Sequence, residues 1–243
     1  MFPHRYCRAS LDVNQLRSGK TFVAKILPVP ADPSPSFFVP IADLVHRGGL
    51  LAVGTESSYA LAASVSNPTA LDRVIEAKER PSGKPLLVLI GERSQLDALA
   101  GSVPSWFHAM IDEFWPGPLT VIVPAKHGLS PVLTAGTGTI GIREPAPAFL
   151  RALLRHTGPL TGTSANRSGQ PSCLTADEVE ASLGHDVDLI LDAGPAPGNR
   201  PSTLLSVVDE PVILRAGPVS AEEIQGVLSQ IGLLVPVKET AVE

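Results

Sequence analysis

The chain is poor in cysteine and in long apolar runs, and each shortage excludes a class of protein. Its 243 residues include 2 cysteines, Cys7 and Cys173, without the spacing of a metal site or a disulfide framework. No apolar run reaches the roughly 18 residues that a membrane-spanning helix needs. We therefore predict a cytoplasmic protein with no membrane segment and no metal site of its own.

The chain also lacks net positive charge. Its formal net charge is −5 at pH 7 and its sequence pI is near 5.7. A protein that coats nucleic acid without sequence preference draws most of its binding free energy from a basic surface. This composition excludes that class of protein, although it is compatible with a local basic cleft.

The apolar content is sufficient for a sizeable core, since 44% of the residues are hydrophobic. Residues 1–40 are basic and rich in proline, and we predict a flexible N-terminal extension there. The scarcity of acidic residues in that segment is also compatible with an organellar transit peptide. We predict one catalytic domain over residues 41–230 and a C-terminal tail over residues 231–243.

Hydrophobic periodicity predicts alternating helices and strands over the domain, and therefore an α/β fold. The expected helices include residues 41–45, 68–78, 94–99, 104–114, 146–156, 176–183 and 220–228. The expected strands are residues 50–53, 85–90, 119–123, 139–143, 160–163, 189–191, 203–208 and 212–215. The strands lack uniform helical crossovers, which favours one mixed, twisted sheet with flanking helices.

Two short polar clusters stand where helices meet turns rich in proline or glycine. Lys78-Glu79-Arg80 precedes Pro81 at what we take to be an exposed helix end, and Ser164-Ala165-Asn166 precedes Gly169. Cations neutralise phosphates, and hydroxyl groups with backbone donors hold them in position. Together the clusters predict a phosphate-binding site, although each alone is better explained as a charged helix end or an ordinary turn.

Six motifs occur in a fixed order and carry a family resemblance. They are Gly54-Thr55-Glu56-Ser57-Ser58-Tyr59-Ala60-Leu61, Lys78-Glu79-Arg80-Pro81, Trp115-Pro116-Gly117-Pro118-Leu119-Thr120, Gly141-Ile142-Arg143, Thr163-Ser164-Ala165-Asn166-Arg167-Ser168-Gly169 and Pro201-Ser202-Thr203. Over residues 41–217 the chain resembles the YrdC-like threonylcarbamoyl-AMP synthases. The chain ends 28 residues after Arg215, which predicts the short form of the family, without an additional C-terminal domain.

The resemblance implies a twisted mixed sheet folded around a positively lined cleft. It also implies a nucleotidyltransferase that makes threonylcarbamoyl-AMP and pyrophosphate from L-threonine, bicarbonate and ATP, with Mg²⁺ accompanying the ATP. The product serves threonylcarbamoyladenosine (t6A) modification of tRNA, so RNA binding is expected and tRNA and tRNA-modification proteins are candidate partners.

Residue roles follow from the resemblance alone. The expected catalytic residues are Lys78, Arg80, Ser164 and Asn166. The expected ATP-binding residues are Arg80, Lys84, Thr139, Ser164, Asn166, Ser172 and Arg215. The expected threonine-binding residues are Thr55, Ser57, Arg143 and Ser202. A guanidinium suits a carboxylate because its fork matches two oxygens, yet Arg143 is also compatible with a surface ion pair to Glu144.

The chain departs from the family pattern at positions near the expected amino-acid pocket. These are Gly54, Ser57, Ser58, Ala60 and Leu89. The departures leave the identity of the amino acid more open than the use of ATP. The alternatives are a family member that binds nucleotide or double-stranded RNA without adenylate synthesis, and one that uses another amino acid. A module of a larger carbamoyl-transfer enzyme is the weakest alternative, because cysteine-rich metal fingers are absent from the sequence.

Overall fold

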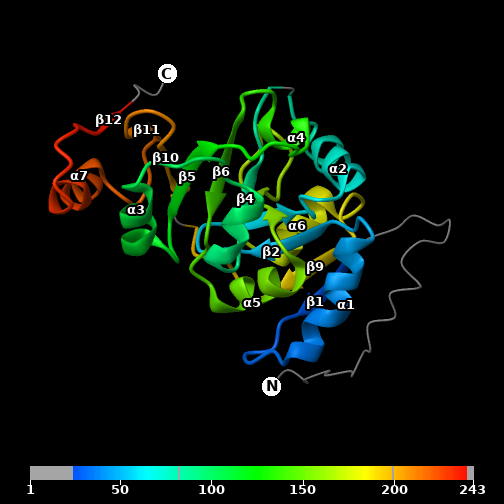
Figure 1. The fold of residues 1–243 in the computed structure, drawn as a ribbon. Helices are drawn as coiled ribbons and strands as arrows, with labels where there is room; N and C mark the ends of the chain where they lie inside the picture. The colour runs from blue at the N-terminus through cyan, green and yellow to red at the C-terminus, as the bar shows by residue number, and fades with distance from the viewer. Residues whose placement is uncertain (1–23, 82, 199, 240–243) are drawn as a thin grey trace.

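The computed structural model describes residues 24–81, 83–198 and 200–239, and shows a mixed α/β fold (Figure 1). The α/β class is confirmed, but the strands form two mixed sheets where the sequence predicted one. One sheet has five strands and the other has seven. The two sheets matter for function because the candidate site lies between them.

The five-stranded sheet is covered by helices on both faces. Its order is β1 (Lys25–Pro28), β9 (Leu189–Asp192), β2 (Leu51–Gly54), β3 (Tyr59–Ala62) and β8 (Thr163–Ser164). Helices α1 (Pro35–His46) and α5 (Ala148–Thr157) pack with β2, β3 and β9 in one hydrophobic cluster. Helices α2 (Pro68–Lys78) and α6 (Ala176–Leu183) pack on the other side, in the main core. Because both faces are buried, the central strands β9, β2 and β3 are almost continuously apolar.

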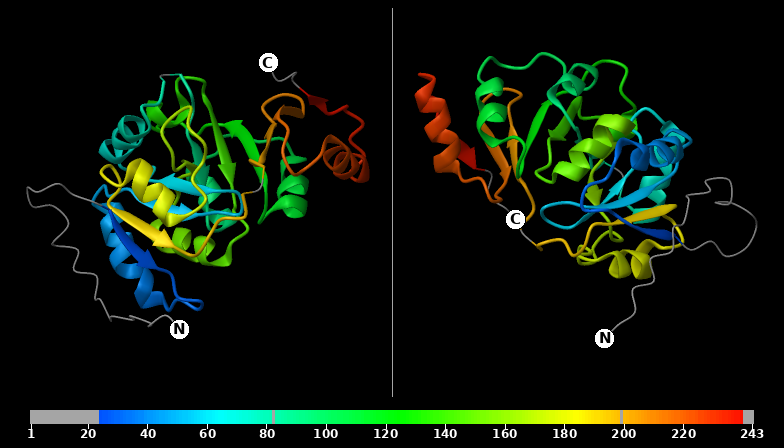
Figure 2. Two further views of the ribbon diagram at one scale, coloured as in Figure 1. Left: turned by 180° about the vertical axis from the view of Figure 1, so that it is seen from behind. Right: turned by 90° about the horizontal axis from the view of Figure 1, so that it is seen from below.

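The seven-stranded sheet buries one face and turns the other toward a cavity. Its order is β12 (Lys238–Glu239), β11 (Val212–Arg215), β10 (Thr203–Ser206), β5 (Leu119–Pro124), β6 (Thr139–Arg143), β4 (Leu87–Leu89) and β7 (Leu160–Thr161). Helices α3 (Phe107–Phe114) and α7 (Ala221–Gln230) lie side by side at the β10–β12 end (Figure 2). The remaining helices of the described residues are the short η2 (Arg93–Ala98) and α4 (Pro131–Thr134).

The two-residue period of a strand separates core residues from cavity residues on this sheet. In β5, Val121 is buried in the main core, whereas Thr120 and Ile122 line the cavity. In β6, Ile142 is buried while its neighbours Gly141 and Arg143 line the cavity. The alternation therefore delivers a row of cavity-facing positions across the sheet.

Gly162 is the point where the chain leaves one sheet for the other. Thr161 pairs with Val88 in the seven-stranded sheet, and Thr163 pairs with Leu61 in the five-stranded sheet. A Cβ atom on Gly162 would lie 2.5 Å from Cγ of Leu89, so only glycine permits this close approach. The single strand predicted over residues 160–163 is accordingly two short strands in different sheets.

The N-terminal extension predicted over residues 1–40 is wrong for residues 24–40. Strand β1 pairs in parallel with β9, and α1 begins at Pro35 and buries Phe38. Proline is favoured in the first turn of a helix, so proline content alone does not indicate a linker. Residues 1–23 lie outside the described residues.

The C-terminal tail predicted over residues 231–243 also contributes to the fold. Strand β12 pairs with β11, and Leu233 packs against the main core. Helix α7 ends at Gln230. Residues 240–243 lie outside the described residues.

Local capping signals explain several helix boundaries. The Asn67 side chain accepts a hydrogen bond from the Ala70 amide at 3.1 Å, and α2 ends at Glu79, whose φ is 49°. The Thr175 side chain accepts from the Glu178 amide and caps α6, whereas the Glu178 side chain accepts from the Leu174 amide, so no capping box closes there. A complete capping box instead joins Ser220 and Glu223 at α7.

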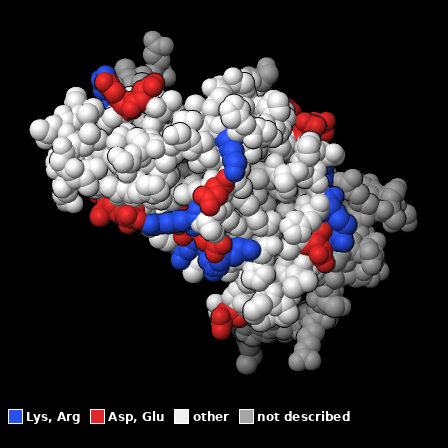
Figure 3. All heavy atoms as spheres, viewed as in Figure 1, with Lys and Arg blue, Asp and Glu red and all other residues white. Residues whose placement is uncertain are grey.

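The surface shows no large area of one charge on the face drawn in Figure 3, where basic and acidic side chains lie next to one another. Two of the ion pairs in the structure are Arg93 with Asp112 and Arg151 with Glu144. No helix in the described part of the chain is both long and apolar enough to cross a membrane.

Candidate active site

A cavity of about 880 Å³ lies between the open face of the seven-stranded sheet and the β3–β8 edge of the five-stranded sheet. Its floor comes from β4, β6, β5, β10 and β11. Its opposite wall comes from the loop before β3, from β8 and from the turn after β8. The cavity thus collects residues that are distant in sequence but adjacent across the two sheets.

Most of the predicted site residues line this cavity. They are Thr55, Ser57, Arg80, Thr139, Arg143, Ser164, Ser172, Ser202 and Arg215. Lys78, Lys84 and Asn166 are absent from its lining as the structure describes it. The described lining contains 3 arginines and no aspartate or glutamate, and Glu56, which is outside this lining, pairs with Arg143.

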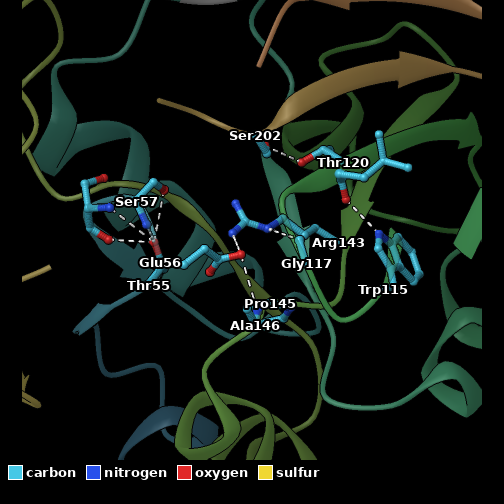
Figure 4. Close-up of polar contacts among 12 residues, drawn as sticks. Thr55, Glu56, Ser57, Trp115, Gly117, Thr120, Arg143, Pro145, Ala146 and Ser202 are labelled. Carbon is cyan, nitrogen blue, oxygen red and sulfur yellow. Dashed lines mark hydrogen bonds and ion pairs between the residues drawn. The ribbon is translucent and has the colours of Figure 1, made fainter. Parts of the chain in front are cut away.

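Arg143 is buried at the end of β6 and held by two partners. Its side chain donates from Nε to the Gly117 carbonyl at 3.1 Å and forms an ion pair with Glu56 (Figure 4). Glu56 Oε1 also accepts a hydrogen bond from the Ala146 amide at 3.3 Å. The alternative of a surface pair with Glu144 is wrong, because Arg143 is only 5% exposed and Glu144 pairs with Arg151.

The loop between β2 and β3 is organised by the Thr55 hydroxyl. Thr55 Oγ1 donates to the Ser58 carbonyl at 2.7 Å and accepts from the amides of Ser57 and Ser58. Such a local turn competes with regular structure and holds the loop away from a strand conformation. It places Ser57 at the cavity wall together with Arg143.

Ser202, just before β10, connects to a residue that the sequence did not single out. Its hydroxyl lies 2.7 Å from that of Thr120, and its carbonyl accepts from Arg215 Nη2 at 2.9 Å. Thr120 ends the Trp115–Thr120 motif, and the alternation of β5 could have assigned it to the cavity face. It was missed because the residue roles were taken from the resemblance alone.

Lys78 joins the two polar clusters into one unit. Its Nζ donates to the carbonyls of Ser164 at 2.5 Å and Asn166 at 2.7 Å, and its own carbonyl accepts from the Ser168 amide at 2.9 Å. The side chain is buried, so the expected exposed helix end is wrong. Burial, reinforced by the charge of Arg80, lowers the pKa of Lys78 to about 8.

Asn166 lies behind the cavity wall with Lys78. Its Nδ2 donates to the carbonyls of Arg167 at 2.8 Å and Gln170 at 2.7 Å. Its Oδ1 is buried and has no hydrogen-bond partner among the described residues. The direct phosphate contacts expected for Lys78 and Asn166 therefore stay predictions, whereas their part in holding the turn is visible.

Arg80 reaches the cavity from the loop that follows α2. The left-handed conformation of Glu79 ends the helix and redirects the chain. Arg80 then donates from Nε to the Lys84 carbonyl at 3.3 Å and from Nη2 to the Pro85 carbonyl at 3.0 Å. Burial lowers the pKa of its guanidinium, which remains a cation at neutral pH.

A second cavity of about 410 Å³ adjoins the first. Ser57, Arg143 and Ser202 line both cavities, while Glu56 and Arg200 belong to the second alone. Among the described residues, no group of three or more histidine, cysteine, aspartate or glutamate side chains could hold a metal ion. Cys173 is buried, and burial raises the pKa of its thiol.

The fold and this cavity define an α/β protein with a pocket of hydroxyl groups and arginines between two mixed sheets. The family model for the Sua5/YciO/YrdC domain, described as telomere recombination, matches residues 43–217. The chain belongs to this family.

Two relatives have names that give the same activity. The chain is 40% identical over 193 residues to the threonylcarbamoyl-AMP synthase of Bacillus subtilis, covering 78% of this chain and 56% of that protein. It is 34% identical over 185 residues to a putative threonylcarbamoyl-AMP synthase of Mycobacterium tuberculosis, covering 76% of this chain and 85% of the relative. The chain thus spans 56% of the length of the Bacillus subtilis protein, and the same share of a Pyrococcus abyssi relative.

Solved structures share the fold. Pyrococcus abyssi Sua5 complexed with L-threonine aligns with a TM-score of 0.82 and 30% identity, over 89% of this chain and 63% of that one. Escherichia coli YciO aligns with a TM-score of 0.73 and 25% identity, over 82% of this chain and 98% of that one.

Proposed function

We propose that the chain is an L-threonylcarbamoyladenylate synthase, which makes threonylcarbamoyl-AMP and pyrophosphate from L-threonine, bicarbonate and ATP. The observation that carries the proposal is the cavity, whose described lining joins three arginines and a series of hydroxyl groups without any carboxylate. All the proposed substrates bear carboxylate, bicarbonate or phosphate oxygens. The activity names of the relatives support the same reaction.

The amino acid is proposed to bind at the Arg143 end of the cavity. Gly117 and Glu56 occupy Nε and one terminal nitrogen of the guanidinium, and they fix its orientation. A guanidinium held in this way presents its remaining donors to a carboxylate without losing side-chain entropy on binding. The complex of the Pyrococcus abyssi relative with L-threonine supports this choice of substrate.

The reaction requires two bond-forming steps and no covalent intermediate with the enzyme. The amine of threonine attacks bicarbonate, and water is lost as the carbamate forms. A carbamate oxygen then attacks the α-phosphorus of ATP, and the bond to the β-phosphate breaks to release pyrophosphate. The chain contributes by bringing the reactants together and offsetting their negative charge, which are the main contributions to phosphoryl-transfer catalysis.

ATP is proposed to lie along the cavity between Arg80 and Arg215, with Thr139, Ser164 and Ser172 as hydroxyl partners. Magnesium ordinarily binds one or two carboxylates together with phosphates and water. The described lining offers hydroxyl groups but no carboxylate, so these residues fit an ion that enters with ATP and not one held by the chain itself. The product would pass to the transfer step that modifies tRNA, with tRNA-modification proteins as partners.

A direct assay tests the proposal. Purified protein is incubated with ATP, magnesium and bicarbonate together with each of several amino acids. Pyrophosphate release is followed, and the adenylate is identified by mass spectrometry. We expect pyrophosphate release that depends on both threonine and bicarbonate. Pyrophosphate release that is independent of the amino acid would refute the proposal, and a preference for another amino acid would correct the substrate.

A further inference from the structure

Thr120 is a buried polar residue on the cavity floor, next to the residues proposed to bind the amino acid. It is 0% exposed, it lines the cavity, and its hydroxyl lies 2.7 Å from the hydroxyl of Ser202. Ser202 is 3% exposed. Burying two hydroxyl groups costs free energy unless their hydrogen bonds are satisfied.

The strand register places this hydroxyl pair beside Arg143. Thr120 precedes Val121, whose partner across the β5–β6 ladder is Ile142, the residue before Arg143. On its other side Thr120 is in register with Leu204, two residues after Ser202. The pair and the guanidinium thus lie on neighbouring strands at one end of the cavity (Figure 4).

Counting protons shows what the pair presents to a ligand. Each hydroxyl carries one proton and two lone pairs. One of the two protons lies between the oxygens of Thr120 and Ser202, and the other is left to donate. Arg215 Nη2 also approaches Ser202 Oγ at 3.4 Å, and a guanidinium only donates. If Ser202 accepts from both Thr120 and Arg215, its own proton is directed to a ligand.

We propose that Thr120 is a positioning residue, which orients the Ser202 hydroxyl as a donor to the amino-acid carboxylate held by Arg143. This inference rests on the proposed function, because it assumes that an amino acid occupies the Arg143 end. Arg143 and the Ser202 hydroxyl would then approach one carboxylate from two strands. Thr120 itself makes no contact with the substrate in this arrangement.

The test compares Thr120→Val with Thr120→Ser. Valine nearly preserves the shape and removes the hydroxyl, whereas serine retains it. The matched control is Thr161→Val, which removes a buried hydroxyl that bonds to the Leu61 carbonyl and the Ala63 amide outside the cavity lining. The readouts are the dissociation constants of L-threonine and ATP by calorimetry, together with KM and kcat for threonine-dependent pyrophosphate release.

For Thr120→Val we expect threonine affinity to fall about three- to tenfold, the range for a single lost hydrogen bond, while ATP affinity stays within about twofold. Thr120→Ser should restore threonine affinity, and Thr161→Val should lower thermal stability without changing either affinity. L-2-aminobutyrate lacks the side-chain hydroxyl of threonine but keeps the carboxylate. Thr120→Val should therefore bind it more weakly than wild type does, by the same factor as for threonine.

Several outcomes would overturn the inference. Unchanged threonine affinity in folded Thr120→Val, an equal loss for ATP, or failure of serine to restore affinity would each do so. A loss confined to threonine and absent for L-2-aminobutyrate would refute the carboxylate assignment. If the valine variant does not fold, the serine variant must match wild type in threonine affinity for the inference to survive. Wild-type protein without threonine-dependent pyrophosphate release would overturn the proposed function as well.

Discussion

The two ends of the cavity hold their arginines in different ways. Arg143 stands on strand β6, is 5% exposed, and is fixed by Gly117 and by the ion pair with Glu56. Arg80 comes from the loop after α2, is only half-buried, and donates to two carbonyls of its own loop. One arginine is held by other parts of the fold, and the other by its sequence neighbours.

This difference indicates that the two ends of the cavity would have different roles in substrate binding. Side chains on strands with locked partners hold a ligand more accurately than side chains on loops. An amino acid must be distinguished from others of similar size, whereas a triphosphate is bound largely through its charge. We therefore expect selectivity to reside at the Arg143 end and charge neutralisation at the Arg80 end.

Replacing Arg143 should have the largest effect. Arg143→Ala should weaken threonine binding by roughly 2–5 kcal/mol, the usual effect of truncating a buried, hydrogen-bonded charge. Arg143→Lys keeps the positive charge but loses the forked pair of guanidinium donors, so it should also weaken threonine binding. Calorimetric titration of threonine and ATP measures both, with Arg151→Ala as a control because its ion pair to Glu144 lies outside the cavity lining. A loss of ATP affinity instead would assign Arg143 to the nucleotide end.

Removing β1 should affect stability and leave the site intact. We compare a variant that lacks residues 1–34 with one that lacks residues 1–23. Only the longer deletion removes β1, the strand paired with β9. At about 0.5–1.5 kcal/mol for each lost backbone hydrogen bond, unfolding should become easier by roughly 2–4 kcal/mol. No residue of β1 lines the cavity, so activity per folded molecule should be unchanged. Urea denaturation and pyrophosphate release measure the two quantities, and equal stability of the two deletions would contradict the role of β1.

Arg80→Ala tests the loop-borne end of the comparison. The loss of a charge-assisted contact to phosphate should cost roughly 1.5–3 kcal/mol in ATP-dependent turnover. Thermal stability should change little, because the hydrogen bonds of Arg80 stay within its own loop. Steady-state kinetics with ATP and threonine varied separately provide the measurement. A selective rise in KM for threonine would show that the two ends do not divide the substrates in this way.

For Lys78 the expected effect is a pH dependence of stability, which is absent at neutral pH and below. Its pKa is about 8 in the folded chain against an ordinary value of 10.5. Between these values the unfolded chain holds a proton that the folded chain has lost, so raising the pH should favour folding. The gain approaches about 1.4 kcal/mol for each pH unit within that window and is absent below it. Denaturant titrations of wild type and Lys78→Met from pH 7 to 10 measure the difference, and parallel curves would refute the lowered pKa.

Some elements could be predicted because their signals are local. The Asn67 cap, the proline after it and the apolar spacing of residues 71–75 predicted α2 almost to its ends. The alternation of residues 139–143 predicted β6 with its boundaries. In these segments the hydrogen bonds and the buried face depend on residues within a few positions of one another.

Other features depend on contacts between distant residues. No local signal shows that Gly162 transfers the chain from one sheet to the other, or that Glu56 reaches Arg143. The burial of Lys78 is equally hidden, because a lysine at a helix end is ordinarily exposed. The proline-rich segment was misread for the same reason, since only its pairing with β9 distinguishes β1 from a linker.

By itself the sequence determined the α/β class, most helix and strand positions, and the set of polar motifs from which the candidate site is built. Capping, periodicity and turn chemistry act over a few residues, so they are readable along the chain. Only the tertiary structure decided which of those motifs face the cavity and which hold its wall. Arg143 and Ser202 face inward, while Lys78 and Asn166 support the turn from behind. That division follows from the packing of two sheets against each other, and it sets burial and hydrogen-bond partners that no local pattern encodes.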